Sequence, residues 1–147
     1  MTRKLQQCGK NEKRSGRVYE YMKVVLDTNI LVSALLSPAG NPAKIYRMFL
    51  TRVLSLVLSM DIFKEYQEVL QRPRLSLPAD NAETVLAAIW HYGEKITPVP
   101  STNVMIDEDD RIFYDTAKSA GAYLITGNTK HYPQEPFIVT PKKFLEL

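Results

Sequence analysis

The sequence has only one cysteine and two histidines, and this scarcity restricts the kinds of site that it can build. Cys8 alone excludes an internal disulfide and a zinc site of paired cysteines. His91 and His131 lie far apart in the chain, in no spacing typical of zinc ligands. Any chemistry must therefore use other side chains.

Long apolar runs and phosphate-binding glycine motifs are also missing. The longest strongly apolar run, residues 53–60, is far shorter than the roughly 20 residues that span a bilayer. The first residues are polar and basic, unlike a secretory signal. The six glycines form neither a GxGxxG nor a GxxxxGK motif, which argues against a nucleotide-binding loop. We therefore expect a cytoplasmic protein with no membrane segment.

The positive charge of the chain is concentrated at its start. The formal net charge is +3, but residues 1–21 contain six basic and two acidic residues, which leaves 13 basic and 14 acidic residues in the remainder. Because this segment has almost no aliphatic side chains, we expect a basic, flexible extension. A nucleic-acid-binding arm is one interpretation, but Met22, directly before the first expected strand, favours an upstream translation start or an adventitious extension. Residues 22–147 would then form one domain.

From residue 22 onward, apolar runs alternate with amphipathic segments. Asn41 before Pro42 predicts the start of the second helix, and Ser59 the cap of the third. Strands alternating with helices predict a three-layer α/β/α sandwich with a mainly parallel central sheet. The expected strands are 23–26, 53–58, 122–126 and 137–140, and the expected helices are 29–36, 41–49, 60–72, the segment between 78 and 93, 111–120 and a short one after 140.

Apolar residues at helical spacing predict which helix faces turn inward. We also expect the aromatic residues Tyr46, Phe49, Trp90 and Tyr92 in the core or in a dimer interface rather than as base-stacking platforms. The third helix carries Ile62, Phe63, Tyr66, Val69 and Leu70, and the fourth carries Val85, Leu86, Ile89 and Trp90.

Acidic side chains stand where such a sheet binds its ligands, outside the carboxyl ends of the strands. Asp27 ends the first strand, and Thr126 ends a later one. A helix cap would be an ordinary role for Asp27. Glu65 lies in a helical stripe with Asp61 and Glu68, for which a solvated helix face is the ordinary explanation.

Four consecutive carboxylates, from Asp107 to Asp110, stand just before the helix at 111–120. Negative charge at a helix N-terminus contributes about 0.3 to 1 kcal/mol per group, but four adjacent carboxylates repel one another and require a cation or solvent. If these acids converge with Asp27 and Glu65, their hard oxygen ligands suit Mg²⁺ or Mn²⁺. Without a metal, repulsion between the carboxylates would raise their pKa values. With a metal, the same pocket becomes a phosphodiesterase site.

Four segments occur in an order that is typical of one family: VVLDTNILV at 24–32, KEYQEVL with Glu65, DEDDRIFYDTA from Asp107, and AYLITGN at 122–128. Together they resemble the PIN domain family, the PilT N-terminus nucleases, and the likeness covers residues 22–147. The resemblance implies a ribonuclease dependent on Mg²⁺ or Mn²⁺, most often the toxin of a type II toxin-antitoxin pair. It also implies an RNA substrate, a cognate antitoxin protein as partner, and commonly a homodimer.

By position, the resemblance implies that Asp27, Glu65 and Asp110 are the catalytic metal ligands. Asp110 is preferred over its neighbours because the family places this acid seven residues before a small helical residue, here Ala117. Asp107 is a further candidate, as an outer ligand.

The resemblance also implies supporting residues. Thr28 and Asn29 match the polar pair that orients a ligand or binds its water. Thr126 and Asn128 match the loop after the later strand, but many relatives carry Asp where this chain has Asn128. Asparagine brings no charge, so the number of metal ions stays open.

Two other functions fit parts of the pattern. A degenerate PIN domain that binds RNA or protein without cleavage would account for Asn128. Aspartyl-phosphate chemistry on Asp27 is disfavoured, because a second acid is usual two residues on and Asn29 stands there. Lys130 and His131 could contact RNA phosphate or simply be solvated.

Overall fold

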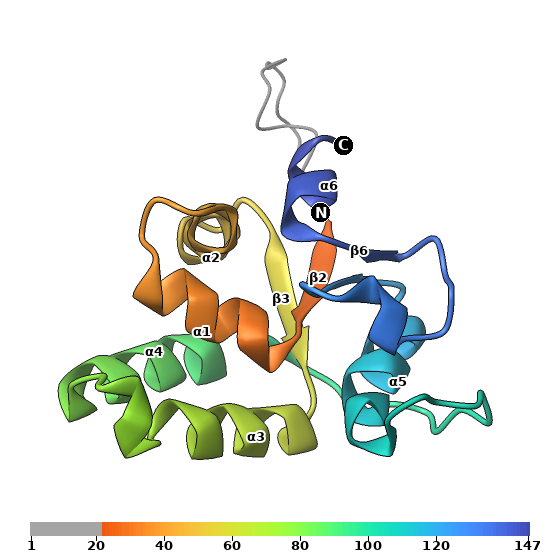
Figure 1. Ribbon diagram of the computed structural model, residues 1–147, viewed down its shortest axis with the longest axis horizontal. Coiled ribbons are helices and arrows are strands. Elements are labelled where there is room, and N and C mark those ends of the chain that lie inside the picture. The colour runs from red at the N-terminus through yellow and green to blue at the C-terminus, as the bar shows by residue number, and fades with distance from the viewer. Residues whose placement is uncertain (1–21) are drawn as a thin grey trace, which may run out of the picture.

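The computed structural model describes residues 22–147, which form six α-helices around a five-stranded sheet (Figure 1). The expected N-terminal extension, residues 1–21, lies outside the described residues. Within the described part of the chain, no helix is both long enough and apolar enough to cross a bilayer.

Every pairing in the sheet is parallel, and the strand order is β4-β3-β2-β5-β6. After the half-buried Lys23, the central strand β2 consists of aliphatic residues that are buried on both faces, as its sequence predicts. The strands are β2 (Lys23–Leu26), β3 (Ser55–Leu58), β4 (Glu94–Lys95), β5 (Tyr123–Ile125) and β6 (Ile138–Val139).

Helices cover both faces of the sheet. In Figure 1, α1 and α2 lie on one side of β2 and β3, and α5 lies on the other. This arrangement confirms the predicted three-layer α/β/α sandwich. The helices are α1 (Thr28–Leu36), α2 (Asn41–Leu50), α3 (Met60–Leu70), α4 (Ala79–Tyr92), α5 (Arg111–Ala120) and α6 (Pro141–Leu145).

Strand β4 is absent from the sequence-based expectation, because both of its residues are exposed and show no apolar pattern. It follows Gly93, where a Cβ atom would lie 2.7 Å from Leu58 Cδ2 and 2.5 Å from the carbonyl oxygen of Ile89. Only glycine permits so close an approach between the end of α4 and β3. The tight packing then directs the chain into the edge of the sheet.

Other local predictions need correction. The cap position of α2 is Gly40, not Asn41, because the first helical turn closes on the Gly40 carbonyl and no side chain caps it. Strand β3 begins at Ser55, because the preceding backbone N–H groups donate to Met48 and close the end of α2. Trp90 is 39% exposed rather than a full member of the core.

The remaining side-chain predictions are confirmed in part. Ser59 caps α3, since its hydroxyl accepts from the N–H of Ile62 at 3.2 Å. Tyr46 and Phe49 are buried, whereas Tyr92 is 47% exposed. Of the apolar residues predicted on α3 and α4, most are buried, Phe63 and Val69 are half-buried, and Trp90 is exposed where α4 reaches the surface.

The strand order reverses beside β2. The chain proceeds from β2 outward to β3 and β4, and then returns to place β5 on the other side of β2. The crossovers on the two sides leave a crevice outside the carboxyl ends of β2 and β5, where parallel sheets bind their ligands. Asp27 follows β2 and Thr126 follows β5, so the topology brings both to this crevice.

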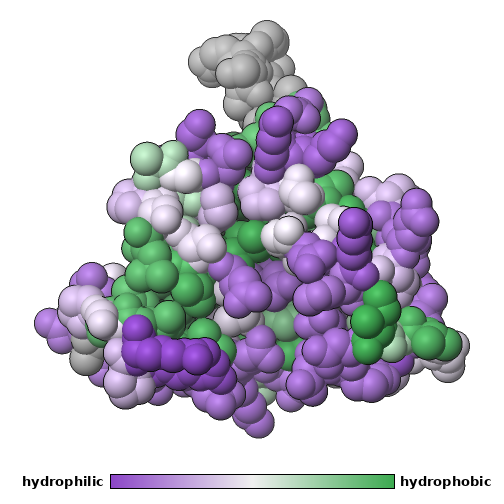
Figure 2. All heavy atoms as spheres, viewed as in Figure 1, coloured by the Kyte–Doolittle hydropathy of each residue, from purple (hydrophilic) through white to green (hydrophobic). Residues whose placement is uncertain are grey.

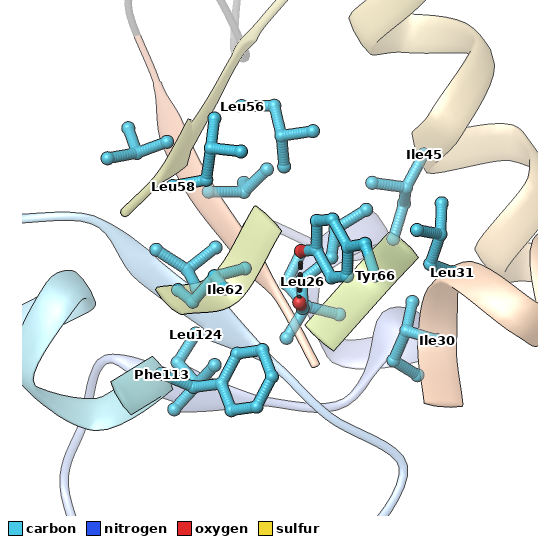
Figure 3. Close-up of a cluster of buried hydrophobic side chains, with 14 of the residues drawn as sticks. Leu26, Ile30, Leu31, Ile45, Leu56, Leu58, Ile62, Tyr66, Phe113 and Leu124 are labelled. Atoms are coloured by element: carbon cyan, nitrogen blue, oxygen red, sulfur yellow. Dashed lines mark hydrogen bonds between the residues drawn. The ribbon is translucent and has the colours of Figure 1, made fainter. Parts of the chain in front are cut away.

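A buried tyrosine joins α3 to the central strand. Tyr66 is fully buried among apolar side chains, and its hydroxyl donates to the carbonyl oxygen of Leu26 at 2.6 Å (Figure 3). Leu26 directly precedes Asp27, and Glu65 directly precedes Tyr66. This hydrogen bond therefore fixes the backbone positions from which the two acids project.

We predict that Tyr66→Phe lowers the free energy of unfolding by about 1 to 3 kcal/mol, because a buried hydrogen bond to the backbone is lost while the ring remains. Urea unfolding followed by circular dichroism measures this change. Tyr123→Phe is the control, since no hydrogen bond of the Tyr123 hydroxyl is found among the described residues. Equal stability of the two variants would contradict a stabilising role for the bond.

Candidate active site

A polar cleft of about 580 Å³ opens beside the carboxyl end of β2, between α1, α3 and the start of α5. In the view of Figure 1, the lower edge of the molecule, along α3, is mostly hydrophilic (Figure 2). We call this the acidic cleft. Its charged lining consists of Asp27, Glu65, Glu68, Asp107, Asp109 and Asp110 with Arg72 and Arg74, and its other lining residues are Thr28, Asn29, Val32, Val69 and Leu75.

Asp27 occupies the N-cap position of α1, but its side chain makes no capping hydrogen bond. Its Oδ2 instead accepts from Thr126 Oγ1 at 2.9 Å and from Tyr132 Oη at 3.1 Å. Its Oδ1 has no hydrogen-bond partner among the described residues. Capping therefore does not account for Asp27, and one carboxylate oxygen is left for a ligand.

Glu65 differs from the other acids of its helix. It is half-buried, and its Oε2 accepts from Thr28 Oγ1 at 2.5 Å, across from α1. Asp61 is exposed and outside the cleft lining, and Glu68 is exposed and paired with Arg72 at 3.5 Å. The acidic stripe is thus a solvated face except at Glu65.

The run of four acids is divided between two roles. Glu108 pairs with Arg111 at 2.8 Å, and this hydrogen bond holds the pKa of the Glu108 carboxyl below its usual value. Asp107 Oδ1 accepts from the N–H of Asp109 at 3.0 Å and so caps the 3₁₀ turn η3 (Glu108–Asp110), while it still lines the cleft. Only one of the four charges is neutralised by a cationic side chain within residues 22–147.

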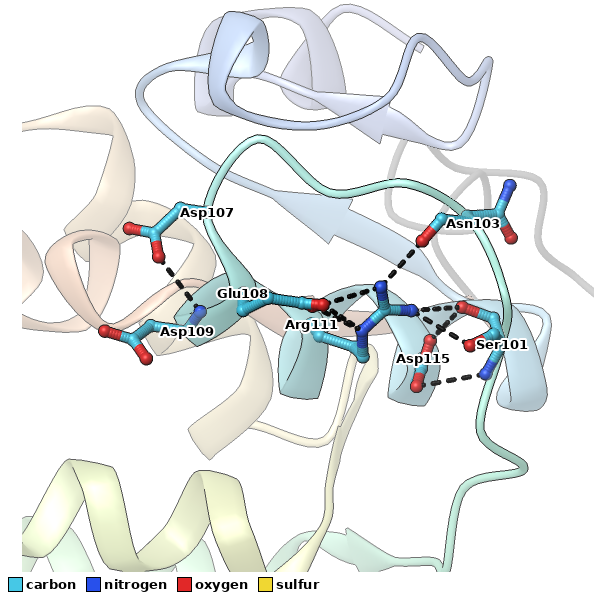
Figure 4. Close-up of polar contacts among 7 residues, drawn as sticks. All are labelled: Ser101, Asn103, Asp107, Glu108, Asp109, Arg111 and Asp115. Atoms are coloured by element: carbon cyan, nitrogen blue, oxygen red, sulfur yellow. Dashed lines mark hydrogen bonds and ion pairs between the residues drawn. The ribbon is translucent and has the colours of Figure 1, made fainter.

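The loop before these acids is anchored to α5 (Figure 4). Arg111 donates to the carbonyl oxygens of Ser101 at 3.0 Å and Asn103 at 2.7 Å. The buried Asp115 accepts from the Ser101 N–H at 3.2 Å and from its hydroxyl. These bonds hold the acidic run at the start of α5 without using the carboxylate of Asp110.

Asp110 makes no side-chain hydrogen bond or ion pair within residues 22–147. It occupies the N-cap position of α5 without a side-chain capping bond. Its pKa is raised from 3.8 to about 6, first by burial and then by the charges of Asp27 and Asp107, while His131 acts in the opposite direction. The same two influences, burial first and then the carboxylates, raise the pKa values of Tyr66 and Tyr132. Both tyrosines therefore remain hydrogen-bond donors at neutral pH.

The acidic side chains of the cleft are possible ligands of a divalent cation. Among residues 22–147, no three acidic, histidine or cysteine side chains are grouped closely enough to hold a metal ion as they stand. Mg²⁺, however, usually takes one or two carboxylates and keeps several waters, so a preformed trio is not required. All three acids line the cleft, and among the described residues one oxygen of Asp27, one of Glu65 and both of Asp110 accept no hydrogen bond. The chemistry of these residues fits a hard, hydrated cation.

The loop after β5 contributes only part of what the sequence predicts. Thr126 is buried and bonded to Asp27, although it is not part of the cleft lining. Asn128 is exposed and outside the cleft lining, and its side-chain oxygen accepts from the N–H of Lys130 at 3.2 Å. Lys130 lines a separate cavity of about 530 Å³, and His131 is exposed near Asp110. Of the eight predicted site residues, the cleft lining therefore includes Asp27, Thr28, Asn29, Glu65, Asp107 and Asp110.

Three residues of this region are absent from the sequence-based prediction. Arg72 and Arg74 line the cleft from the N-cap position and the interior of the 3₁₀ turn η2 (Pro73–Leu75), which follows α3. The one sequence feature that could have indicated them is the pair of arginines on either side of Pro73, directly after a predicted helix. Tyr132 has no such signal, because its contact with Asp27 spans 105 positions.

Comparison with known proteins places these features in context. A family model described as PIN domain matches residues 23–130. The uncharacterized protein MJ1680 of Methanocaldococcus jannaschii is 33% identical over 110 residues, which cover 73% of this chain and 71% of the relative.

Two solved structures share the fold. One is VapBC2 from Rickettsia felis bound to a DNA fragment from its promoter, with a TM-score of 0.55 at 18% identity over 81% of this chain and 97% of that chain. The other is PAE2754 from Pyrobaculum aerophilum, with a TM-score of 0.56 at 15% identity over 86% of this chain and 88% of that chain. At these identities the likeness shows the fold alone.

We predict that Asp110→Asn stabilises the metal-free protein at neutral pH. The pKa of Asp110 is raised from 3.8 to about 6 in the folded state, so folding favours the protonated carboxyl. The contribution of Asp110 to the free energy of unfolding is therefore fully present below pH 3.8 and is lost as the pH rises toward 6. Because the group is partly exposed, we expect a gain of only about 1 kcal/mol above pH 6 and none below pH 4.

Urea unfolding in the presence of a chelator, at several pH values between these limits, measures the difference. Asp109→Asn is the control, because Asp109 lies in the same turn but is exposed. A stability difference between Asp110→Asn and the unsubstituted protein that does not change with pH would rule out the electrostatic explanation.

Proposed function

The chain belongs to the PIN domain family, whose members are usually nucleases, and on this premise we propose that it is a metal-dependent endoribonuclease. The observation that carries the proposal is the convergence of Asp27, Glu65 and Asp110 on one cleft. They come from the end of the central strand, from α3 and from the start of α5, at the point where the strand order reverses.

In this proposal Asp27, Glu65 and Asp110 hold Mg²⁺ or Mn²⁺. A bound divalent cation supplies Lewis-acid chemistry at this place, activating water for attack on phosphorus and offsetting phosphate charge. Asn29 and Asp107 line the same cleft and serve as outer ligands or bind the waters of the ion.

The chain's own residues prepare the site for this chemistry. Thr28 orients the carboxylate of Glu65, and Thr126 and Tyr132 orient that of Asp27. Arg74 forms no ion pair within residues 22–147, so its guanidinium is available at the rim of the cleft for an RNA phosphate. Arg72 is partly engaged by Glu68.

We infer further that the protein is the toxin of a type II toxin-antitoxin pair. Support comes from the family and from the shared fold with VapBC2 of Rickettsia felis. In this proposal the protein forms a homodimer, is bound by a cognate antitoxin protein, and acts on RNA in the cytoplasm. Detection of an antitoxin gene directly beside the coding sequence tests the biological role independently of the chemistry.

A second candidate is an RNA- or protein-binding module with weakened catalysis. Two observations favour it: Asn128 brings no charge and uses its side-chain oxygen to cap its own turn, and the described residues contain no preformed metal cluster. The two candidates differ in whether Mg²⁺ binds at millimolar concentrations and whether bound RNA is cleaved.

We predict that the purified protein cleaves RNA only with Mg²⁺ or Mn²⁺, and that Asp27→Asn reduces cleavage by about 100-fold or more, because the main charge at the strand end is lost. Cleavage of a labelled RNA with and without chelator measures this. Asp61→Asn is the matched control, since Asp61 is an exposed acid of α3 outside the cleft.

Full activity of Asp27→Asn, or cleavage in excess chelator, would overturn the nuclease mechanism. RNA binding without cleavage and without any Mg²⁺ binding in the millimolar range would instead establish the binding module.

We predict that Arg74→Gln weakens RNA binding several-fold and makes it less sensitive to salt. Loss of one phosphate contact on a single strand reduces the slope of log affinity against log salt by about 0.7. Fluorescence anisotropy at several salt concentrations measures both changes. Lys142→Gln is the control, because it removes one positive charge from α6, at the opposite end of the molecule from α3 (Figure 1). Identical salt slopes for the two variants would exclude an Arg74 phosphate contact.

A further inference from the structure

Tyr132 connects the loop after β5 to the carboxylate at the end of β2. It is only 3% exposed and its ring belongs to the main core, so its position is fixed by packing. Its hydroxyl lies 3.1 Å from Oδ2 of Asp27. A carboxylate oxygen cannot donate when ionised, so the tyrosine is the donor in this bond.

The second donor to the same oxygen is also fixed in direction. Thr126 Oγ1 accepts from the N–H of Asn128 at 3.2 Å and lies 2.9 Å from Asp27 Oδ2. Because the hydroxyl has a single proton and the N–H of Asn128 already donates to its oxygen, that proton points to Asp27. The backbone of the loop thus sets the orientation of the Thr126 hydroxyl.

These contacts divide the carboxylate of Asp27 into two unequal oxygens. Oδ2 receives two hydrogen bonds, which use its two lone pairs, whereas Oδ1 receives none among the described residues. No ion pair with Asp27 is found within residues 22–147. Neutral donors therefore orient the carboxylate without cancelling the charge that a cation requires.

We propose that Tyr132 is a positioning residue that, with Thr126, keeps Oδ2 of Asp27 away from the metal, so that Asp27 binds a divalent cation through Oδ1 alone. This inference rests on the proposed function and adds a selectivity to it. Mg²⁺ requires near-octahedral geometry with short bonds, whereas Ca²⁺ accepts carboxylates that bind through both oxygens. Holding Oδ2 back therefore favours Mg²⁺ and Mn²⁺ over Ca²⁺.

The test is Tyr132→Phe, which keeps the buried ring and removes only the hydroxyl. Isothermal titration calorimetry with Mg²⁺, Mn²⁺ and Ca²⁺ gives the dissociation constants without reference to catalysis. We expect Mg²⁺ and Mn²⁺ binding to weaken about 10-fold, as for other groups that orient a metal ligand. Ca²⁺ binding stays equal or becomes tighter, so the ratio of Ca²⁺ to Mg²⁺ affinity rises.

Tyr114→Phe is the matched control. Tyr114 is a fully buried tyrosine whose hydroxyl donates to the carboxylate of Glu135, and Glu135 does not line the acidic cleft. This variant loses the same kind of bond but keeps the metal preference of the unsubstituted protein. Thr126→Val is a second test, since it releases the same oxygen of Asp27 if Tyr132→Phe fails to fold.

The outcomes separate the two proposals. One outcome is that the unsubstituted protein binds Mg²⁺ and cleaves RNA while Tyr132→Phe and Thr126→Val keep its preference for Mg²⁺ over Ca²⁺. In that case Tyr132 has no positioning role, and the proposed function stands. A uniform loss of affinity for all three ions would also overturn the inference, because it would indicate a merely structural role. Absence of metal binding in the unsubstituted protein would overturn both proposals.

Discussion

Neutral hydroxyl groups fix the positions of two carboxylates that repel each other. Thr28 binds Glu65, and Thr126 and Tyr132 bind Asp27. A buried arginine would hold either acid more strongly, but its charge would compete with any cation in the cleft. Hydroxyl donors solve this conflict because they fix direction and leave the negative charge in place. The layout of the acidic cleft depends on this choice of partners.

The fold brings these groups together at the ends of adjacent strands. Thr126 lies 99 positions after Asp27 in the sequence, but the two residues are close in space because β2 and β5 are neighbouring strands. The N–H of Asp27 donates to the carbonyl oxygen of Ile125 at 3.0 Å. The acidic run is held in place differently, because the loop between β4 and the run forms no strand in the described part of the chain. Arg111 offsets the charge of Glu108 and anchors the loop, while Asp110, which lines the cleft, forms no ion pair within residues 22–147.

The sequence predicts those parts of the site that depend on local pattern. A buried apolar run locates Asp27 at a strand end, and Ser59 locates the helix that carries Glu65. It does not reveal Tyr132, because a tyrosine that packs in the core and also reaches an acid 105 positions away resembles any core tyrosine. Strand β4 is equally hidden, since its exposed residues take their place from the close packing at Gly93.

Charge at the cleft, rather than charge of the whole chain, governs how a polyanion can approach. Residues 22–147 contain 13 basic and 14 acidic residues, so the domain as a whole offers no long-range attraction for RNA. The cleft lining adds local repulsion, with six acids against two arginines. Under the proposed function, attraction for phosphate would therefore come from a bound cation acting beside Arg74, and substrate binding would be coupled to metal binding. In the absence of metal, the same carboxylates would repel RNA from the cleft.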